Sequence, residues 1–132
     1  MEFMENKVCL DSDFIIDFLR NDKNAIRWLN ENSETEIVTT AISVFELYLG
    51  EYKSESSNRM QKLEEFIEKL DILILNREIA KKAAEVAAKL EKDGKMIDFR
   101  DILIGCIALT HKIPLKTNNK KHFERIVGLE LI

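Results

Sequence analysis

The sequence of 132 residues contains one proline, four glycines and two cysteines. So little proline and glycine leaves no room for a flexible linker between two domains. A chain of this length buries one substantial core, so we expect a single domain over residues 1–132. Cys9 and Cys106 each lie in an apolar run, and neither has a second cysteine or a histidine at metal-ligand spacing. We therefore expect two reduced, buried thiols and no zinc site.

Long hydrophobic runs are also absent from the sequence. No apolar stretch approaches the roughly 20 residues that a membrane-spanning helix needs. Glu2 and Glu5 stand where a secretory leader would be basic, and the apolar residues 8–10 are too few for the centre of such a leader. We expect a cytoplasmic protein that does not cross a membrane.

Positive charge is in deficit, with 20 Lys and Arg against 24 Asp and Glu and a net charge of −4. This balance argues against a protein that holds nucleic acid by bulk charge alone, so any such contact must be local. A cluster of basic residues does lie near the C-terminus: Lys112, Lys116, Lys120, Lys121, His122 and Arg125. Such a cluster is typical either of a solvated surface or of a local binding surface.

Short β-branched or apolar runs alternate with segments of helical periodicity along the chain. The predicted strands are residues 7–10, 36–39, 71–75 and 114–117. The predicted helices are residues 12–20, 24–30, 43–53, 56–70, 78–92, 99–111 and 120–126, and Gly94 is placed to end the fifth of them. This alternation predicts an α/β fold, a three-layer α/β/α sandwich around a mostly parallel central sheet of four to five strands.

Acidic or amide side chains recur just after the predicted strands or at the helix starts that follow. In an open parallel sheet, ligands bind beyond the carboxyl ends of the strands. The candidates for this edge are Asp11, Glu46, Asp98, Asp101 and Asn119. Carboxylates that gather repel one another unless a cation lies between them, and oxygen ligands suit Mg²⁺ or Mn²⁺ better than zinc. The pattern indicates a divalent metal site, and phosphoryl chemistry is its natural use.

The same residues have a purely structural interpretation, because helix N-termini favour these side chains. Asp11 and Asp98 could cap the helices that follow them, and Asn119 could cap the last helix. Ser43 and Glu46 match a capping box, in which Glu46 would return a hydrogen bond to the Ser43 backbone. The spacing alone leaves both interpretations open at each position.

Two further carboxylates, Asp13 and Asp17, lie four residues apart on the first predicted helix and would repel each other if unpaired. Arg20 and Lys23 are nearby partners. We expect Asp17 at the surface, whereas Asp13 could reach the same cleft as Asp11.

Three aromatic residues, Trp28, Tyr48 and Tyr52, could stack on nucleic acid bases. Aromatic side chains at helical spacing are more often part of a core or an interface. We therefore place them outside the candidate site.

Four segments of the sequence carry a family resemblance. They are residues 8–17 (VCLDSDFIID), 42–50 (ISVFELYLG), 101–108 (DILIGCIA) and the block made by 115–119 and 122–126. In this order they resemble the four motifs of the VapC-like PIN-domain ribonucleases. Four ordered motifs that span nearly the whole chain are more specific than any single carboxylate.

The resemblance implies an acidic pocket in which Asp11, Glu46 and Asp101 hold Mg²⁺ or Mn²⁺, with Asp98 as an additional acid. Many PIN nucleases carry Asp where this chain has Asn119, so the implied role of Asn119 is to orient a metal-bound water. The resemblance also implies cleavage of structured RNA such as tRNA, a homodimer, and a cognate VapB-like antitoxin that inserts a segment near the active site.

Two other functions stay open. Asp11 and Asp13 after a strand resemble the DxD nucleophile motif of haloacid-dehalogenase hydrolases, but that family usually has Thr or Val where this chain has Ile15, and it generally needs a longer chain. The protein could also be a non-catalytic binding module that uses the acidic pocket to engage a partner. The retained acids favour the nuclease.

Overall fold

The computed structural model describes residues 6–55 and 59–132, so the predicted helical residues 56–58 lie outside the described part. The elements are β1 (Lys7–Leu10), α1 (Ser12–Leu19), α2 (Lys23–Glu31), β2 (Glu36–Thr40), α3 (Ala41–Lys53), α4 (Met60–Ile67), β3 (Asp71–Leu73), α5 (Arg77–Lys92), α6 (Phe99–Thr110), β4 (Leu115–Lys116) and α7 (Lys120–Phe123). Each predicted strand and helix has a counterpart, although β3, β4, α4 and α7 are clearly shorter than predicted.

The four strands form one sheet in the order β3-β2-β1-β4, and all of its pairings are parallel. Cys9 of β1 is opposite Val38 of β2 on one side and Leu115 of β4 on the other. The chain therefore moves outward from β1 through β2 to β3 and then returns to the other side of β1. The strand order reverses between β1 and β4, and this is the point at which open α/β sheets form a crevice at their carboxyl edge.

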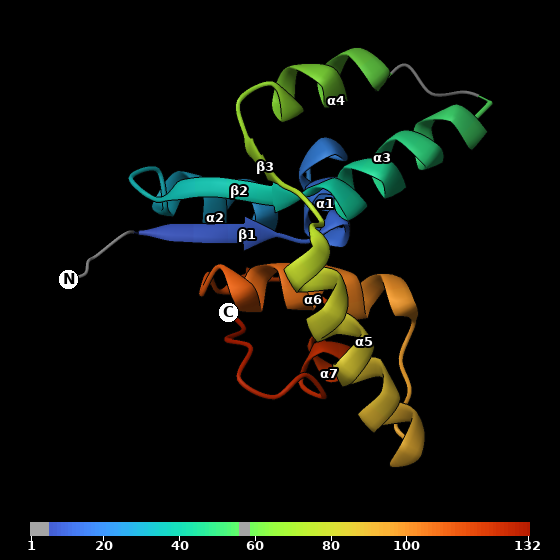
Figure 1. Ribbon diagram of the computed structural model, residues 1–132. Helices are drawn as coiled ribbons and strands as arrows, with labels where there is room; N and C mark the ends of the chain where they lie inside the picture. Colours follow the sequence, from blue (N-terminus) through green and yellow to red (C-terminus); the bar gives the residue numbers. More distant parts are fainter. Residues whose placement is uncertain (1–5, 56–58) are drawn as a thin grey trace.

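Helices cover both faces of the sheet, so the predicted α/β/α sandwich is confirmed (Figure 1). Val8 and Leu10 point to one face, where they pack with residues of α1 to α4. Cys9, which lies between them, points to the other face and packs with residues of α5 and α6. This alternation follows from the two-residue period of a strand, and a parallel sheet needs both faces buried.

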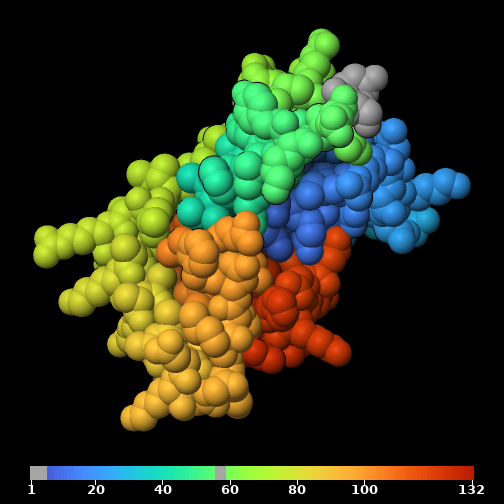
Figure 2. Space-filling view, turned by 90° about the vertical axis from the view of Figure 1, so that its right-hand side faces the viewer, coloured from blue at the N-terminus to red at the C-terminus, as the bar shows by residue number. Residues whose placement is uncertain are grey.

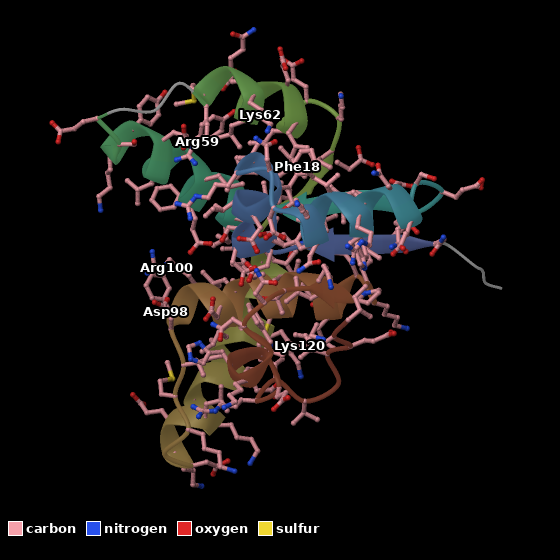
Figure 3. All side chains as sticks on the ribbon, turned by 180° about the vertical axis from the view of Figure 1, so that it is seen from behind. Phe18, Arg59, Lys62, Asp98, Arg100 and Lys120 are labelled. Carbon is pink, nitrogen blue, oxygen red and sulfur yellow. The ribbon has the colours of Figure 1, made fainter. Side chains whose placement is uncertain are left out.

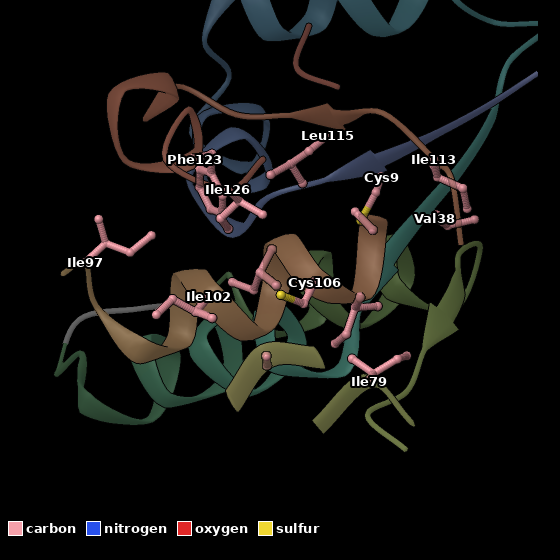
Figure 4. Packing of buried hydrophobic residues seen from close by; sticks show 14 of the residues in the cluster. Cys9, Val38, Ile79, Ile97, Ile102, Cys106, Ile113, Leu115, Phe123 and Ile126 are labelled. Atoms are coloured by element: carbon pink, nitrogen blue, oxygen red, sulfur yellow. The ribbon is translucent and has the colours of Figure 1, made fainter. Parts of the chain in front are cut away.

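Helix α6 is the centre of the helical layer that covers the Cys9 face of the sheet. Ile102 and Cys106 on α6 lie between the sheet residues Cys9 and Leu115 and the α5 residue Ile79 (Figure 4). Cys9 and Cys106 are both buried and unpaired, as predicted, and burial raises the pKa of the Cys9 thiol to about 12. Neutral thiols in an apolar core serve as packing groups. Within the described ranges, no helix combines the length and apolar character needed to span a bilayer.

The C-terminus of α5 shows the glycine end that the sequence predicted. Gly94 has a positive φ of 69°. Its N–H donates to the Glu91 carbonyl at 3.1 Å, and the Lys95 N–H donates to the Leu90 carbonyl at 2.8 Å. This pair of bonds closes the helix as a Schellman motif, and a residue with a side chain would strain that backbone conformation.

Two helical glycines differ in the space around them, and this difference predicts opposite effects of the same substitution. A Cβ at Gly50 of α3 would meet nothing within 4 Å, whereas at Gly105 of α6 it would collide with the buried Ile126 side chain. We expect Gly50→Ala to stabilise the protein by about 0.5–1 kcal/mol through helix propensity. Gly105→Ala should be less stable than Gly50→Ala by about 1–3 kcal/mol because of overpacking. Urea unfolding of the two variants measures this difference, and equal stabilisation by both would contradict the tight packing at Gly105.

Candidate active site

Asp11 lies at the carboxyl end of β1, beside β4. Its backbone N–H donates to the Lys116 carbonyl at 2.9 Å. One carboxylate oxygen accepts a hydrogen bond from the Ser12 backbone N–H and the other from the Thr117 hydroxyl, each at 2.8 Å. Asp11 is only 5% exposed. It is therefore both the N-cap of α1 and a buried carboxylate at the reversal point of the sheet.

Burial is the main reason that the pKa of Asp11 is raised to about 7. The Asp13 carboxylate adds to this rise, the hydrogen bonds from Thr117 and Ser12 oppose it, and Asp101 adds a smaller increase. Asp11 is thus influenced both by Asp13, two residues further along the chain, and by Asp101, which comes from a distant segment. A cation among them would favour their ionised forms.

Asp13 lies beside Asp11, because the Thr117 hydroxyl is within hydrogen-bond distance of both carboxylates. Its carboxylate accepts a hydrogen bond from the Asn118 backbone N–H at 3.1 Å, and the Thr117 hydroxyl lies 3.4 Å away. Asp17, one turn further along α1, accepts a hydrogen bond from the Asn118 side-chain amide at 2.8 Å. In the described part of the chain, the partner of Asp17 comes from the loop after β4 and not from a nearby basic residue as expected.

Glu46 lies in the second turn of α3, because this helix begins at Ala41 and not at Ser43 as predicted. Thr40 caps the helix, and its hydroxyl accepts a hydrogen bond from the Ser43 N–H at 3.0 Å. The capping-box interpretation of Ser43 and Glu46 is therefore wrong. Glu46 accepts a hydrogen bond from the Ser12 hydroxyl at 3.0 Å, which connects α3 to the start of α1. Burial raises the pKa of Glu46, and the bond from Ser12 opposes that rise.

Asp98 is the N-cap of α6, as the structural interpretation predicted, and it accepts a hydrogen bond from the Arg100 backbone N–H at 2.8 Å. The Arg100 guanidinium donates to both carboxylate oxygens of Asp98, at 3.2 and 3.0 Å. These bonds lower the pKa of Asp98. Figure 3 shows the two side chains at the start of α6, and Arg100 Nε also lies 3.9 Å from the Glu46 carboxylate. The charge of Asp98 is thus already balanced.

Asp101, in the first turn of α6, has a carboxylate oxygen 3.2 Å from Nδ1 of His122. The same His122 nitrogen lies 2.8 Å from the Asn119 side-chain nitrogen. Asn119 occupies the N-cap position of α7, but its side chain makes no capping hydrogen bond, so the interpretation of Asn119 as a side-chain cap is wrong. Its backbone N–H donates to the Thr117 hydroxyl at 3.0 Å. Asn119 is thereby connected to Asp101 through His122 and to Asp11 through Thr117.

The candidate residues meet at one edge of the molecule. Figure 2 looks onto the side toward which the arrows of β1 and β2 point in Figure 1, and here the blue, green, orange and red segments of the chain meet. These segments contribute Asp11, Glu46, Asp101 and Asn119. In their present positions, no three acidic, histidine or cysteine side chains among residues 6–55 and 59–132 lie close enough together to hold one metal ion. Each carboxylate is hydrogen-bonded or ion-paired to another protein group instead.

Three residues that contact these carboxylates had no site role in the sequence argument. Thr117 was only the end of a strand, Ser12 only the first residue of a helix and His122 only a member of the basic cluster. A polar residue at the end of β4 was a usable signal, because it ends at the same sheet edge as β1. Nothing in the sequence places Ser12 beside Glu46, because that contact depends on how α1 and α3 pack.

The raised pKa of Asp11 makes stability depend on pH. Between the unfolded value of 3.8 and the folded value of about 7, the folded state binds more protons than the unfolded state. Stability therefore falls as pH rises through this window, and the cost remains above it. We expect Asp11→Asn, measured in EDTA, to be more stable than the parent at pH 8, on the order of a few kcal/mol, and to lose most of this gain near pH 4. Thermal unfolding at both pH values measures the gain.

Asp98→Asn is the matched control, because the pKa of Asp98 is lowered by Arg100. The ionised form of Asp98 is stabilised in the folded state, so this variant should be less stable than the parent at neutral pH, and the difference should vanish in acid. If both variants gained stability at pH 8, a general effect of removing negative charge would explain the results better than the burial of Asp11.

Comparison with known proteins identifies relatives along nearly the whole chain. Ribonuclease VapC1 of Methanocaldococcus jannaschii is 33% identical over 127 residues, which cover 96% of this chain and 85% of that protein. The tRNA(fMet)-specific endonuclease VapC of Shigella flexneri is 25% identical over 124 residues, which cover 93% of this chain and 94% of that protein.

The fold also matches solved structures of toxin–antitoxin complexes. A chain in the crystal structure of VapBC2 from Rickettsia felis bound to a DNA fragment from their promoter superposes with a TM-score of 0.87 and 26% identity, covering 96% of this chain and 97% of that chain. The PIN domain family matches residues 8–129. The chain therefore belongs to the PIN domain family.

Proposed function

We propose that this protein is a Mg²⁺- or Mn²⁺-dependent endoribonuclease that cleaves structured, tRNA-like RNA and acts as the toxin of a toxin–antitoxin pair. The observation that carries the proposal is that Asp11, Glu46 and Asp101 lie at the carboxyl edge where the strand order reverses, near enough for Asp101 to add to the rise that burial causes in the pKa of both Asp11 and Glu46. The relatives named as VapC ribonucleases, one of them a tRNA(fMet)-specific endonuclease, support the substrate class.

The donor set suits a hard divalent cation. Asp11, Glu46 and Asp101 offer carboxylate oxygens, and burial raises the pKa of both Asp11 and Glu46, so negative charge at this edge is poorly compensated. A bound Mg²⁺ or Mn²⁺ supplies a Lewis acid that stabilises charge on a phosphodiester and lowers the pKa of a water. Ser12 and His122 each contact one carboxylate oxygen, of Glu46 and of Asp101, so both acids keep a second oxygen that could bind the ion.

The other polar residues at this edge hold the carboxylates in place. Thr117 orients Asp11 through its hydroxyl, and His122 lies between Asp101 and Asn119. We assign Asn119 to orienting a water beside Asp101, and Asp98 to supporting the site through Arg100, which also lies near Glu46. Lys116 and Lys120 lie next to this edge in sequence and are suited to the RNA backbone.

The direct test is cleavage of a total tRNA pool by the purified protein with Mg²⁺ or Mn²⁺ and with EDTA. We expect cleavage only with metal, and we expect Asp11→Asn to reduce the rate by at least about 100-fold, because a ligand of the proposed ion is lost. Addition of a VapB-like antitoxin should abolish the remaining activity of the parent. Cleavage by Asp11→Asn at the parental rate would refute the assignment of the site, and a lack of cleavage by either protein would favour the binding module.

A groove beside Glu46 suits the proposed antitoxin. Its floor is apolar, formed by Ile16, Leu47 and Leu63 among others, and Glu46 and Arg59 contribute to its charged lining. A segment with apolar side chains could lie between α1, α3 and α4 and reach the acidic edge through Glu46. The VapBC2 complex from Rickettsia felis, which has a similar fold, supports a partner of this kind.

We also propose that two copies of the chain associate through α3. Phe45, Leu49 and Tyr52 lie on one face of this helix and are 58%, 37% and 78% exposed. Exposed apolar side chains at helical spacing are typical of an interface.

We expect Phe45→Glu to raise the dimer dissociation constant at least about tenfold, because it places a charge in the apolar contact. Analytical ultracentrifugation measures the shift, with Val127→Glu as the matched control because Val127 is 86% exposed and lies outside α3. An equal effect of both variants would contradict the interface.

A further inference from the structure

A hollow of about 410 Å³ lies beside the acidic edge, between α1, α2 and the end of β4. Its lining includes Phe14, Asp17, Asp22, Trp28, Lys116 and Asn118. The proposed metal ligands Asp11, Glu46 and Asp101 do not line this hollow. It combines aromatic rings with a lysine, a composition typical of surfaces that hold single-stranded nucleic acid.

Asn118 separates the hollow from the acidic edge. Its backbone N–H donates to Asp13, which raises the pKa of Asp11, and its side-chain amide donates to Asp17 inside the hollow. Lys116 lines the hollow two residues before Asn118, and Thr117 between them binds Asp11. An RNA chain cut at the acidic edge would therefore place a neighbouring nucleotide at the hollow.

The aromatic wall of the hollow is only partly covered. Trp28 is half-buried and meets Phe14 edge-on, with ring centroids 5.5 Å apart. Lys116 Nζ lies 5.4 Å from the centre of the Trp28 ring and 5.6 Å from that of Phe14. Trp28 packs against the core on the α1 side of the sheet, in agreement with the sequence argument, and it also lines the hollow beside a cation.

Lys116 shows no ion-pair partner in the part of the chain that the structure describes. Partial burial lowers the pKa of Lys116, and the positive charge of Lys120 lowers it further. Two neighbouring cations without an acidic partner are stabilised by an anion, and a phosphate has the required charge.

The carboxylates in the hollow do not oppose this interpretation. Asp17 accepts a hydrogen bond from Asn118, and Asp22 caps α2 by accepting one from the Ala25 backbone N–H at 3.0 Å. The third carboxylate of the lining is Glu31, and the cation of Arg27 lines the same hollow. The charge of Asp17 and Asp22 is therefore partly compensated by protein donors. Their remaining lone pairs can accept hydrogen bonds from the amino groups of a base.

We propose that this hollow binds one unpaired nucleotide of the RNA substrate, with its base against Trp28 and its phosphate on Lys116. This inference rests on the proposed ribonuclease function and adds a subsite to it. The hollow would select RNA whose cut site lies in a loop, because a base can reach Trp28 only when it is unstacked.

Trp28 is the only tryptophan of the chain, so its fluorescence reports directly on the hollow. The Asp11→Asn protein in EDTA, which cannot cut, is titrated with a single-stranded RNA hexamer and with an abasic hexamer of the same length. We expect saturable quenching by the RNA and little quenching by the abasic chain. Unchanged emission while fluorescence polarisation reports bound RNA would overturn the proposal.

A lysine variant tests the phosphate contact. We expect Lys116→Ala, in the Asp11→Asn background, to weaken hexamer binding about tenfold, which corresponds to about 1.4 kcal/mol. Lys81→Ala removes the same charge from the exposed surface of α5 and should bind as tightly as the parent. Equal affinity of the Lys116 and Lys81 variants would overturn the role of Lys116.

The outcomes separate this inference from the ribonuclease proposal. Quenching by RNA without cleavage by the metal-loaded parent supports the hollow and rejects the nuclease. Metal-dependent cleavage with no quenching, and with parental KM in Lys116→Ala, supports the nuclease and rejects the hollow. Quenching by N-acetyl-arginine amide but not by RNA would assign the hollow to a cationic side chain of a protein partner and would overturn the proposal.

Discussion

The buried carboxylate of Asp11 requires hydrogen-bond donors, and most of the surrounding structure supplies them. A carboxylate that is 5% exposed is costly unless its oxygens are hydrogen-bonded. One donor is the first backbone N–H of α1, so the helix must begin at Ser12 directly after β1. The other is the Thr117 hydroxyl, so β4 must pair with β1 in a register that brings the ends of both strands together. The site therefore lies at the reversal of strand order because that pairing is available only there.

Charge is compensated unevenly around this edge. Arg100 neutralises Asp98 and also lies near Glu46, whereas burial is the main reason that the pKa values of Asp11, Asp13 and Glu46 are raised. On the other side of Asn118, neither Lys116 nor Lys120 forms an ion pair with a carboxylate of the described residues. A region that needs a cation thus lies beside a region that needs an anion. A divalent ion together with a phosphodiester chain satisfies both, and a net charge of −4 is then compatible with RNA as a substrate.

The sequence predicted the elements well and the polar contacts poorly. Periodicity identified the strands, and the position of Gly94 identified the end of α5, because both depend on neighbours close in the chain. The capping box at Ser43 was wrong because Thr40 supplied an equally good cap one turn earlier, and a local pattern cannot choose between two suitable hydroxyls. Ser12, Thr117 and His122 gained contacts with the candidate carboxylates only when their helices and strands packed together.

The sequence itself determined the order of strands and helices, their apolar faces and the acids that follow the strands. Each of these features follows from a period of two or 3.6 residues, or from the preferences of single positions. The tertiary structure decided which acids share an environment, which one Arg100 neutralises, and that Trp28 faces a hollow next to Lys116. The physical reason is distance. Asp11 and Thr117 are 106 residues apart in the chain, yet the Thr117 hydroxyl lies 2.8 Å from an Asp11 carboxylate oxygen. Only the pairing of β1 with β4 brings them together.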